Sequence, residues 1–260
     1  MKPDFPKVQC PFVRKTYEID SGDWKKYGKR LGLRSPEVYL VTPEMNEQHE
    51  WVFDGEDTYA VEKLHGTNCC VEISDGRLVH VQNRMNEIDI LKVVGKKDGL
   101  PPSARLLEGI LNASQLGYLE DGEQYGELIG TRINGNLHKY NGHLFYPFNT
   151  ARTSLLYRSF RTHPRTFNNF SEWFRLYLKS MLYCRMNKIP LGKIFGFLSC
   201  DDTVPFTEGV VFYKDGSEKT SMSKLRRDMY DWYYPNIHIK GLEHWRVDDA
   251  NKFGYTLKGY

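Results

Sequence analysis

The sequence predicts an α+β fold built mainly from antiparallel sheets. Two hairpin patterns and two amphipathic helix patterns support this prediction. The strands are short and follow one another through tight turns, without the regular alternation of strand and helix that produces a parallel sheet. With 260 residues, of which 40% are hydrophobic and 27% charged, the chain is long enough for one large domain with a small appendage.

The first hairpin is expected over Asn68–Ser74 and Arg77–Arg84. Apolar and β-branched residues alternate in both segments, and the dipeptide Asp75-Gly76 lies between them. Asp-Gly suits the positive φ angles of a two-residue turn. A second hairpin of the same kind is expected from Glu208–Tyr213, through another Asp-Gly dipeptide, to Lys224. Further strands are expected over Gln124–Ile129 and His143–Phe148.

Helices are expected between these strands. The segment Ser103–Leu116 carries apolar residues at helical spacing behind a serine that could cap its first turn. The segment Asn169–Met186 has a longer apolar and aromatic stripe at positions i, i+3, i+4 and i+7. Asn169 and Glu172 have the spacing of a capping box. We interpret this stripe as a core-facing surface.

Charge and cysteine content narrow the class of protein. The net charge is +3 and the pI about 8.4, which permits a polyanionic partner without requiring one, because strong nucleic-acid binders usually exceed a pI of roughly 9. The five cysteines form no C-x-x-C pair, so reduced thiols in a cytoplasmic protein are expected. The sequence shows neither a signal peptide nor an apolar run of membrane-spanning length.

The most informative string, VEKLHGTN, runs from Val61 to Asn68. Taken alone, it is a turn that contains one lysine, and a solvated turn lysine would explain it. The string resembles motif I of the covalent nucleotidyltransferases, the superfamily of RNA ligases, DNA ligases and mRNA capping enzymes. The general motif is K-x-D-G, and the K-x-H-G-x-N form, with Lys63 and His65, resembles the phage RNA ligase 2 branch.

The other motifs of this superfamily follow in order over roughly residues 58–230. Segments similar to motifs Ia, III, IIIa, IV and V are Asn83-Arg84, Tyr125–Gly130, Phe145–Phe148, Glu208–Phe212 and Ser223–Asp228. The resemblance implies an ATP-grasp-like adenylation domain over 58–232, preceded by an accessory segment, 1–57, and followed by a short extension, 233–260. Because only 34 residues follow Arg226, no C-terminal OB-fold is expected.

The resemblance also implies a chemistry. Lys63 would attack the α-phosphorus of ATP, and the amine must be deprotonated to do so, although its ordinary pKa is near ~10.4. Lys224 and Arg226 alternate along a strand and so face one side; they are the predicted catalytic cations, and a solvated basic strand end is the alternative. Arg226 departs from the family's K-x-K pattern, because an arginine neutralises phosphate but is a poor proton donor.

The remaining motif residues are expected to bind the nucleotide and a metal, Mg²⁺ or Mn²⁺. Glu127 would hold the ribose and Glu208 the metal or its water, and both carboxylates are hard oxygen ligands. Phe148 would stack on the purine, or Tyr146 in its place. The other nucleotide-binding residues implied are Glu62 at the adenine edge, Asn68 and Arg84 near the α-phosphate or ribose, and His65, which could instead hydrogen-bond within the turn.

The implied function is an ATP-dependent RNA ligase, acting as a monomer and joining 5′-phosphate and 3′-hydroxyl RNA ends, for example in RNA repair. A DNA ligase or capping-type guanylyltransferase shares the lysyl-nucleotide step, and a non-catalytic nucleic-acid-binding relative would share only the fold. Two basic stretches, Lys25–Arg34 and Arg152–Arg165, could contact the RNA backbone or form solvated faces.

Overall fold

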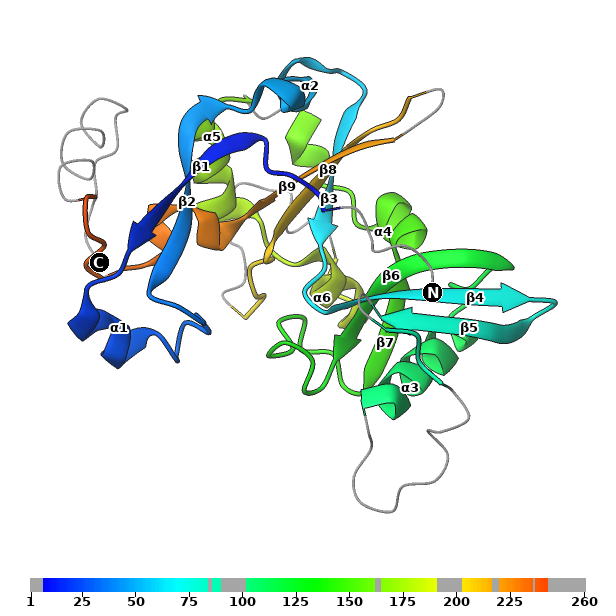
Figure 1. Ribbon diagram of the computed structural model, residues 1–260. Coiled ribbons are helices and arrows are strands. Elements are labelled where there is room, and N and C mark those ends of the chain that lie inside the picture. The colour runs from blue at the N-terminus through cyan, green and yellow to red at the C-terminus, as the bar shows by residue number, and fades with distance from the viewer. Residues whose placement is uncertain are drawn as a thin grey trace.

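The computed structural model shows three antiparallel sheets with helices packed around them (Figure 1). It describes residues 7–83, 86–89, 102–161, 165–190, 203–216, 220–235 and 237–242. Every strand pair in the described sheets is antiparallel, which confirms the predicted fold class. Within these residues, no helix is long and apolar enough to span a membrane.

The central sheet has the strand order β3-β8-β9. Its strands are β3 (Thr58–Lys63), β8 (Gly209–Lys214) and β9 (Ser221–Arg226). The strand pairing of the second predicted hairpin is therefore confirmed, but six positions, 215–220, separate the two strands, so the connection is longer than the two-residue Asp-Gly turn that was expected. Gln9 lies beside Ser223 in a parallel bridge at the outer edge of β9, so the N-terminal segment covers this edge.

A four-stranded sheet with the order β5-β4-β6-β7 lies beside the central one. Its strands are β4 (Thr67–Ser74), β5 (Arg77–Asn83), β6 (Gly122–Gly130) and β7 (His143–Pro147). Asp75 and Gly76 have φ angles of 51° and 69°, as the first hairpin prediction requires. β7 ends one residue before the predicted boundary, because Pro147 has no N–H for the ladder and Phe148 begins the helix α4.

The third sheet pairs β1 (Phe12–Glu18) with β2 (Glu37–Met45), and α1 (Ser21–Tyr27) connects them. This hairpin shares a small apolar core with the end of the described chain (Figure 1). The core consists of Ile19, Val38, Leu40, Tyr234, Ile237, Ile239 and Leu242. The predicted boundaries at 57/58 and 232/233 stay predictions, although segments from both ends pack together here.

The remaining helices are short and surround the sheets. They are α2 (Trp51–Asp54), α3 (Pro102–Gln115), α4 (Phe148–Ser154), α5 (Phe167–Glu172) and α6 (Met181–Met186), with 3-10 turns at Glu47–His49, Arg158–Arg161, Arg227–Met229 and Asp231–Tyr233. α3 lies along β7. It begins at Pro102, so Ser103 lies inside its first turn and not at the cap.

The predicted continuous helix over Asn169–Met186 was wrong. α5 passes into a π-helical turn, Trp173–Tyr177, and then breaks before α6. The chain leaves the helix because the N–H of Ser180 pairs with the carbonyl of Pro205 and its side chain caps α6. The apolar stripe is still buried, as predicted. The capping residue of α5 is Thr166, whose side chain accepts the N–H of Asn169.

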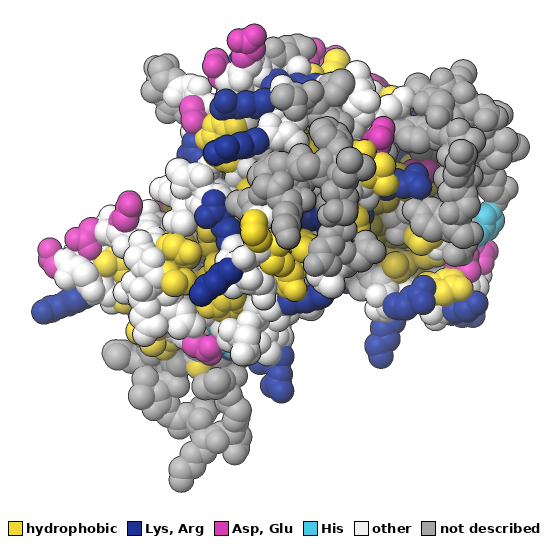
Figure 2. Space-filling model, turned by 180° about the vertical axis from the view of Figure 1, so that it is seen from behind, with side chains coloured by type: hydrophobic (Ala, Val, Ile, Leu, Met, Phe, Trp, Pro, Cys, Tyr) yellow, Lys and Arg dark blue, Asp and Glu magenta, His cyan; other side chains and the backbone are white. Residues whose placement is uncertain are grey.

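Both basic stretches carry exposed cations, including Arg158 and Arg161 in the second, but the second also contains packed residues. In the second, Tyr157 and Phe160 are buried, and Arg152 is bound to Tyr59 and Asp215, so these residues serve packing. In the first, the side chains of Lys25, Lys26, Lys29, Arg30 and Arg34 are exposed. On the face shown in Figure 2, lysine and arginine side chains lie in separate groups among hydrophobic and acidic ones.

Phe12 anchors the N-terminal hairpin to the main core. Its ring is 2% exposed and lies 5.1 Å from the ring of Phe53 and 5.0 Å from that of Phe167. We expect Phe12→Ala to lower the free energy of unfolding by about 3–5 kcal/mol, because it leaves a cavity among aromatic rings. Urea denaturation checks this. As a control, Tyr39→Ala replaces a side chain that is 50% exposed in the same hairpin and should change the free energy of unfolding by less than about 1 kcal/mol. Equal losses in the two variants would contradict this account.

Candidate active site

Lys63 lies where the two larger sheets meet. It is the last residue of β3, and the three-residue turn from Leu64 to Gly66 carries the chain into β4 of the neighbouring sheet (Figure 1). A Cβ atom at Gly66 would lie 2.1 Å from the carbonyl oxygen of Leu128. Only glycine allows the turn to approach β6 this closely, which explains the glycine of the motif physically.

The ammonium of Lys63 is paired with Glu208. Its Nζ atom donates to Oε2 of Glu208 at 2.7 Å and to the carbonyl of Leu64 at 3.1 Å. Both side chains remain about one-fifth exposed, at 20% and 17%. The predicted nucleophile and the predicted metal-binding carboxylate are thus direct neighbours, although 145 residues separate them in the sequence.

Lys224 and Arg226 share the face of the central sheet that carries Lys63. Gly209 pairs with both Lys63 and Arg226, and Val211 pairs with Lys224. Paired residues of antiparallel strands project to the same side. Gly209 has no side chain to separate Lys63 from Arg226.

The charges on this face act on one another. Partial burial, followed by the positive charges of Lys63 and Arg226, lowers the pKa of Lys224. The guanidinium of Arg226 lies 2.9 Å from the carboxylate of Asp228, measured from Nε to Oδ1. Burial raises the pKa of Asp228. The face therefore holds three cations, with carboxylates at its margin.

Glu127 approaches the same site from the four-stranded sheet. It lies on β6, opposite Asn68 on β4 and Tyr146 on β7. Burial raises the pKa of Glu127 to about 7; the charge of Lys63 opposes this shift and that of Glu208 adds to it. Glu127, Glu208 and Lys63 are therefore close enough to interact electrostatically across the junction of the sheets.

Two polar atoms beside Lys63 have no partner within the described part of the chain. They are Oδ1 of Asn68 and Nδ1 of His65, and both are buried. Buried polar atoms are nearly always hydrogen-bonded in folded proteins. These two are therefore suited to bind a polar ligand next to the Lys63 turn, and their role in binding a nucleotide stays a prediction.

The carboxylates offer a partial metal site. Among the described residues, no group of three or more His, Cys, Asp and Glu side chains is placed to hold a metal ion. Mg²⁺, however, is commonly held by one or two carboxylates together with waters and substrate phosphates. Glu127 and Glu208 fit this mode, in which a bound phosphate would supply the remaining ligands.

The side chain of Glu62 points away from Lys63. It is 2% exposed and accepts hydrogen bonds from Oγ of Ser180 at 2.6 Å and from the N–H of Leu182 at 2.8 Å. Burial raises the pKa of Glu62 to about 7, against the effect of these donors. Its carboxylate is therefore occupied by α6, and its backbone N–H donates to the carbonyl of Leu155 at 3.0 Å. The predicted contact of Glu62 with adenine stays a prediction.

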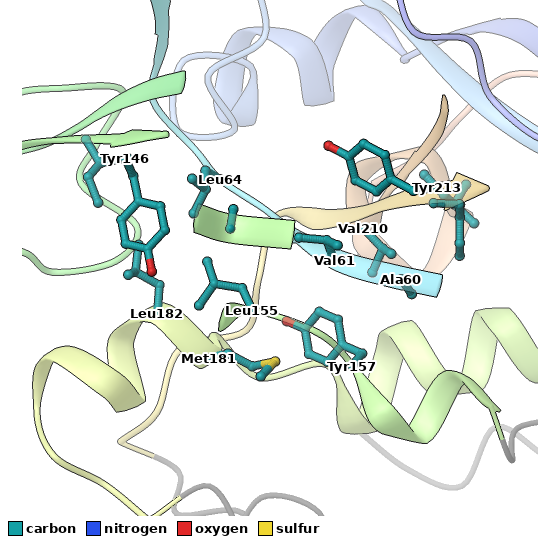
Figure 3. Close-up of a cluster of buried hydrophobic side chains, with 14 of the residues drawn as sticks. Ala60, Val61, Leu64, Tyr146, Leu155, Tyr157, Met181, Leu182, Val210 and Tyr213 are labelled. Atoms are coloured by element: carbon teal, nitrogen blue, oxygen red, sulfur yellow. The ribbon is translucent and has the colours of Figure 1, made fainter. Parts of the chain in front are cut away.

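The aromatic residue beside Glu127 is Tyr146. Its hydroxyl lies 2.9 Å from Oγ of Ser154, and Figure 3 shows it in one buried cluster with Leu64 and Leu182. Phe148 is partly buried at the start of α4, outside the strand. Tyr146 pairs with Glu127, but its ring is only 1% exposed, so the choice between Phe148 and Tyr146 as the purine-stacking residue stays a prediction. Arg84 lies outside the described residues.

No protein-family model matches the sequence, and no curated protein matches it. Solved structures of Naegleria gruberi RNA ligase are similar to the chain. The match to a variant with ATP and Mn covers 85% of this chain and 60% of the ligase chain, at 15% identity and a TM-score of 0.36. The match to the structure with PPi covers 64% of this chain and 48% of the ligase chain, at 16% identity and a TM-score of 0.34.

The chain thus spans about half to three-fifths of the length of these two structures. At these TM-scores and identities the similarity is distant. The function proposed below therefore rests on the residues of this chain and their geometry.

The buried carboxylate of Glu62 makes stability depend on pH. Its pKa is about 7 in the folded protein, above the ordinary 4.5, so its contribution to stability is present at low pH and is lost as the pH rises through 7. Glu62→Gln removes this loss. The unfolding free energy of the variant, relative to wild type, should therefore rise between about pH 5 and about pH 8.

Urea denaturation at both pH values measures this difference. The exposed Glu44→Gln is the matched substitution and should show no comparable change between them. A relative free energy for Glu62→Gln that is constant or falls with pH would contradict the account.

Proposed function

We propose that this protein is an ATP-dependent RNA ligase that forms a covalent lysyl-AMP on Lys63. One observation supports this above all. A lysine, two carboxylates and two further cations, which are scattered over 164 residues of sequence, converge at the junction of two sheets. A protein that only binds nucleic acid needs cations for phosphate but does not need a nucleophile at Lys63.

The first step would be attack by the amine of Lys63 on the α-phosphorus of ATP. A P–N bond forms, the bond from the α-phosphorus to the bridging oxygen breaks, and pyrophosphate leaves with the electron pair. Glu208 holds the Lys63 ammonium at 2.7 Å in the free protein. The amine must lose its proton before it attacks, because an ammonium has no lone pair.

Lys224 and Arg226 would stabilise the charge that develops on the phosphates. Glu127 would bind the ribose. Oδ1 of Asn68 and Nδ1 of His65 would form hydrogen bonds with the nucleotide. Mg²⁺ or Mn²⁺ held by Glu208 and Glu127 would supply further neutralisation of the phosphates. AMP would then pass to an RNA 5′-phosphate, and a 3′-hydroxyl would displace it to join the strands. The exposed cations between Lys25 and Arg34 are suited to contact the RNA backbone.

Formation of the lysyl adduct tests the first step. The purified protein, incubated with Mg²⁺ and ATP labelled at the α-phosphate, should retain the label on a denaturing gel. Lys63→Ala should retain none, whereas Lys15→Ala, at an exposed lysine on β1, should be labelled like wild type. An unlabelled wild-type protein would refute the proposal. Labelling by GTP and not by ATP would assign it to the guanylyltransferases.

The ligation steps need their own assay. With unlabelled ATP and 5′-phosphorylated RNA, offered as single strands and as nicked duplexes, the wild-type protein should give adenylated intermediates and joined RNA. Matched DNA strands serve as the control for the alternative DNA ligase. Lysyl-AMP formation without joining of either nucleic acid would restrict the proposal to its first step.

Arg226 provides a graded test of the cationic face. Arg226→Ala should slow lysyl-AMP formation by about 100-fold, since it removes a charge that stabilises the transition state. Arg226→Lys keeps the charge and restores the K-x-K pattern, so we expect it to stay within about tenfold of wild type. Single-turnover labelling gives the rates, with the exposed Arg158→Ala as control. Equal rates for Arg226→Ala and wild type would remove Arg226 from the site.

A further inference from the structure

A buried chain of hydrogen bonds connects the two sides of the Lys63 turn. His138, which is 1% exposed, accepts the N–H of His65 at its Nε2 atom, 3.0 Å away. Its Nδ1 atom lies 3.1 Å from Oγ of Ser180. Ser180 in turn donates to Oε1 of Glu62 at 2.6 Å. Neither His138 nor Ser180 belongs to any motif of the sequence.

The direction of these hydrogen bonds is determined by chemistry. A backbone N–H can only donate, so Nε2 of His138 must be the accepting nitrogen and the ring proton must lie on Nδ1. Nδ1–H then donates to Oγ of Ser180, whose own proton is free for the Glu62 carboxylate. Burial lowers the pKa of His138 to about 3, so the ring is neutral, as the chain requires.

The ends of this chain flank the predicted nucleophile. Glu62 precedes Lys63, and His65 follows it by two residues, so the chain holds the turn at both of its ends. Asn134, from the same loop as His138, donates to the carbonyl of Gly66 and adds a third anchor. Together these contacts restrict the backbone that carries Lys63.

We propose that His138 and Ser180 are positioning residues, which hold the Lys63 turn in the geometry for attack on ATP. This inference rests on the proposed function, since it assumes that Lys63 is the nucleophile. A displacement of about 1 Å between reacting groups can reduce a rate on the order of 100-fold. A side chain at the start of a short turn needs such a restraint, because a rotation of the backbone in the turn moves its amine.

Two substitutions separate positioning from simple packing. The amide of glutamine reaches the place of Nε2 and can accept the His65 N–H, whereas the shorter asparagine reaches only the place of Nδ1. We expect His138→Asn to lower the rate constant of lysyl-AMP formation at saturating ATP by about 10- to 100-fold. The KM for ATP should stay within about twofold, because His138 does not belong to the nucleotide-binding set. His138→Gln should keep the rate within about threefold of wild type.

The control is His49→Asn, the same change at another buried histidine, located in the N-terminal segment. It should leave the rate unchanged, with the folded fraction of every variant confirmed by thermal denaturation. Equal rates for His138→Asn and wild type would overturn the inference, and so would equal losses in His138→Asn and His138→Gln. A wild-type protein that forms no adduct would instead refute the proposed function.

A spectroscopic measurement tests the chain independently of activity. The ¹⁵N chemical shifts of the His138 ring in the wild-type protein distinguish a protonated Nδ1 from a protonated Nε2. We expect the neutral ring with its proton on Nδ1 from about pH 6 to about pH 8. A proton on Nε2, or a doubly protonated ring, would contradict the direction of the chain and with it the inference.

Discussion

The candidate site depends on the close approach of one glycine to one carbonyl. Gly66 lies against the carbonyl of Leu128, at a distance that leaves no room for a Cβ atom. This contact lets β3 of the central sheet continue into β4 of its neighbour after only three residues. Lys63 therefore ends one strand within reach of two carboxylates: Glu208, just before β8 of the same sheet, and Glu127 on β6 of the other sheet.

The two buried glutamates near this turn have similarly raised pKa values but different neighbours. Burial raises the pKa of both Glu62 and Glu127 to about 7. Glu62 is bound by Ser180 and the N–H of Leu182, so its oxygens are committed to holding the backbone. Glu127 shares its environment with the charges of Lys63 and Glu208, which shift its pKa in opposite directions. One buried carboxylate thus supports the backbone before Lys63, whereas the other interacts with the charges around Lys63.

The sequence predicted the elements whose signals are local. The first Asp-Gly hairpin forms as expected, the strands of the second pair as expected, and strand alternation correctly places Lys224 and Arg226 on one face. The sequence-based prediction failed where contacts with distant residues determine the backbone conformation. The helix after Asn169 breaks because Ser180 is needed by Pro205 and Glu62, and no local pattern shows either partner. His138 was missed for the same reason, since its partners are 73 and 42 residues away. The roles of the site residues in catalysis stay predictions.

The N-terminal segment also takes part in this geometry, through the backbone. The carbonyl of Gln9 accepts the N–H of Lys224 at 2.8 Å and the hydroxyl of Ser223 at 3.1 Å. An exposed edge strand would be free to shift or to pair with another chain. The two hydrogen bonds from Gln9 hold β9 at Ser223 and Lys224. Phe12, three residues later, fixes the segment in the aromatic core. Lys224 and Lys63 repel each other across one sheet face. The hydrogen bonds from Gln9 oppose a displacement of β9 by this repulsion. A segment without recognisable motif residues can therefore contribute to the site by fixing the strand that carries a predicted catalytic cation.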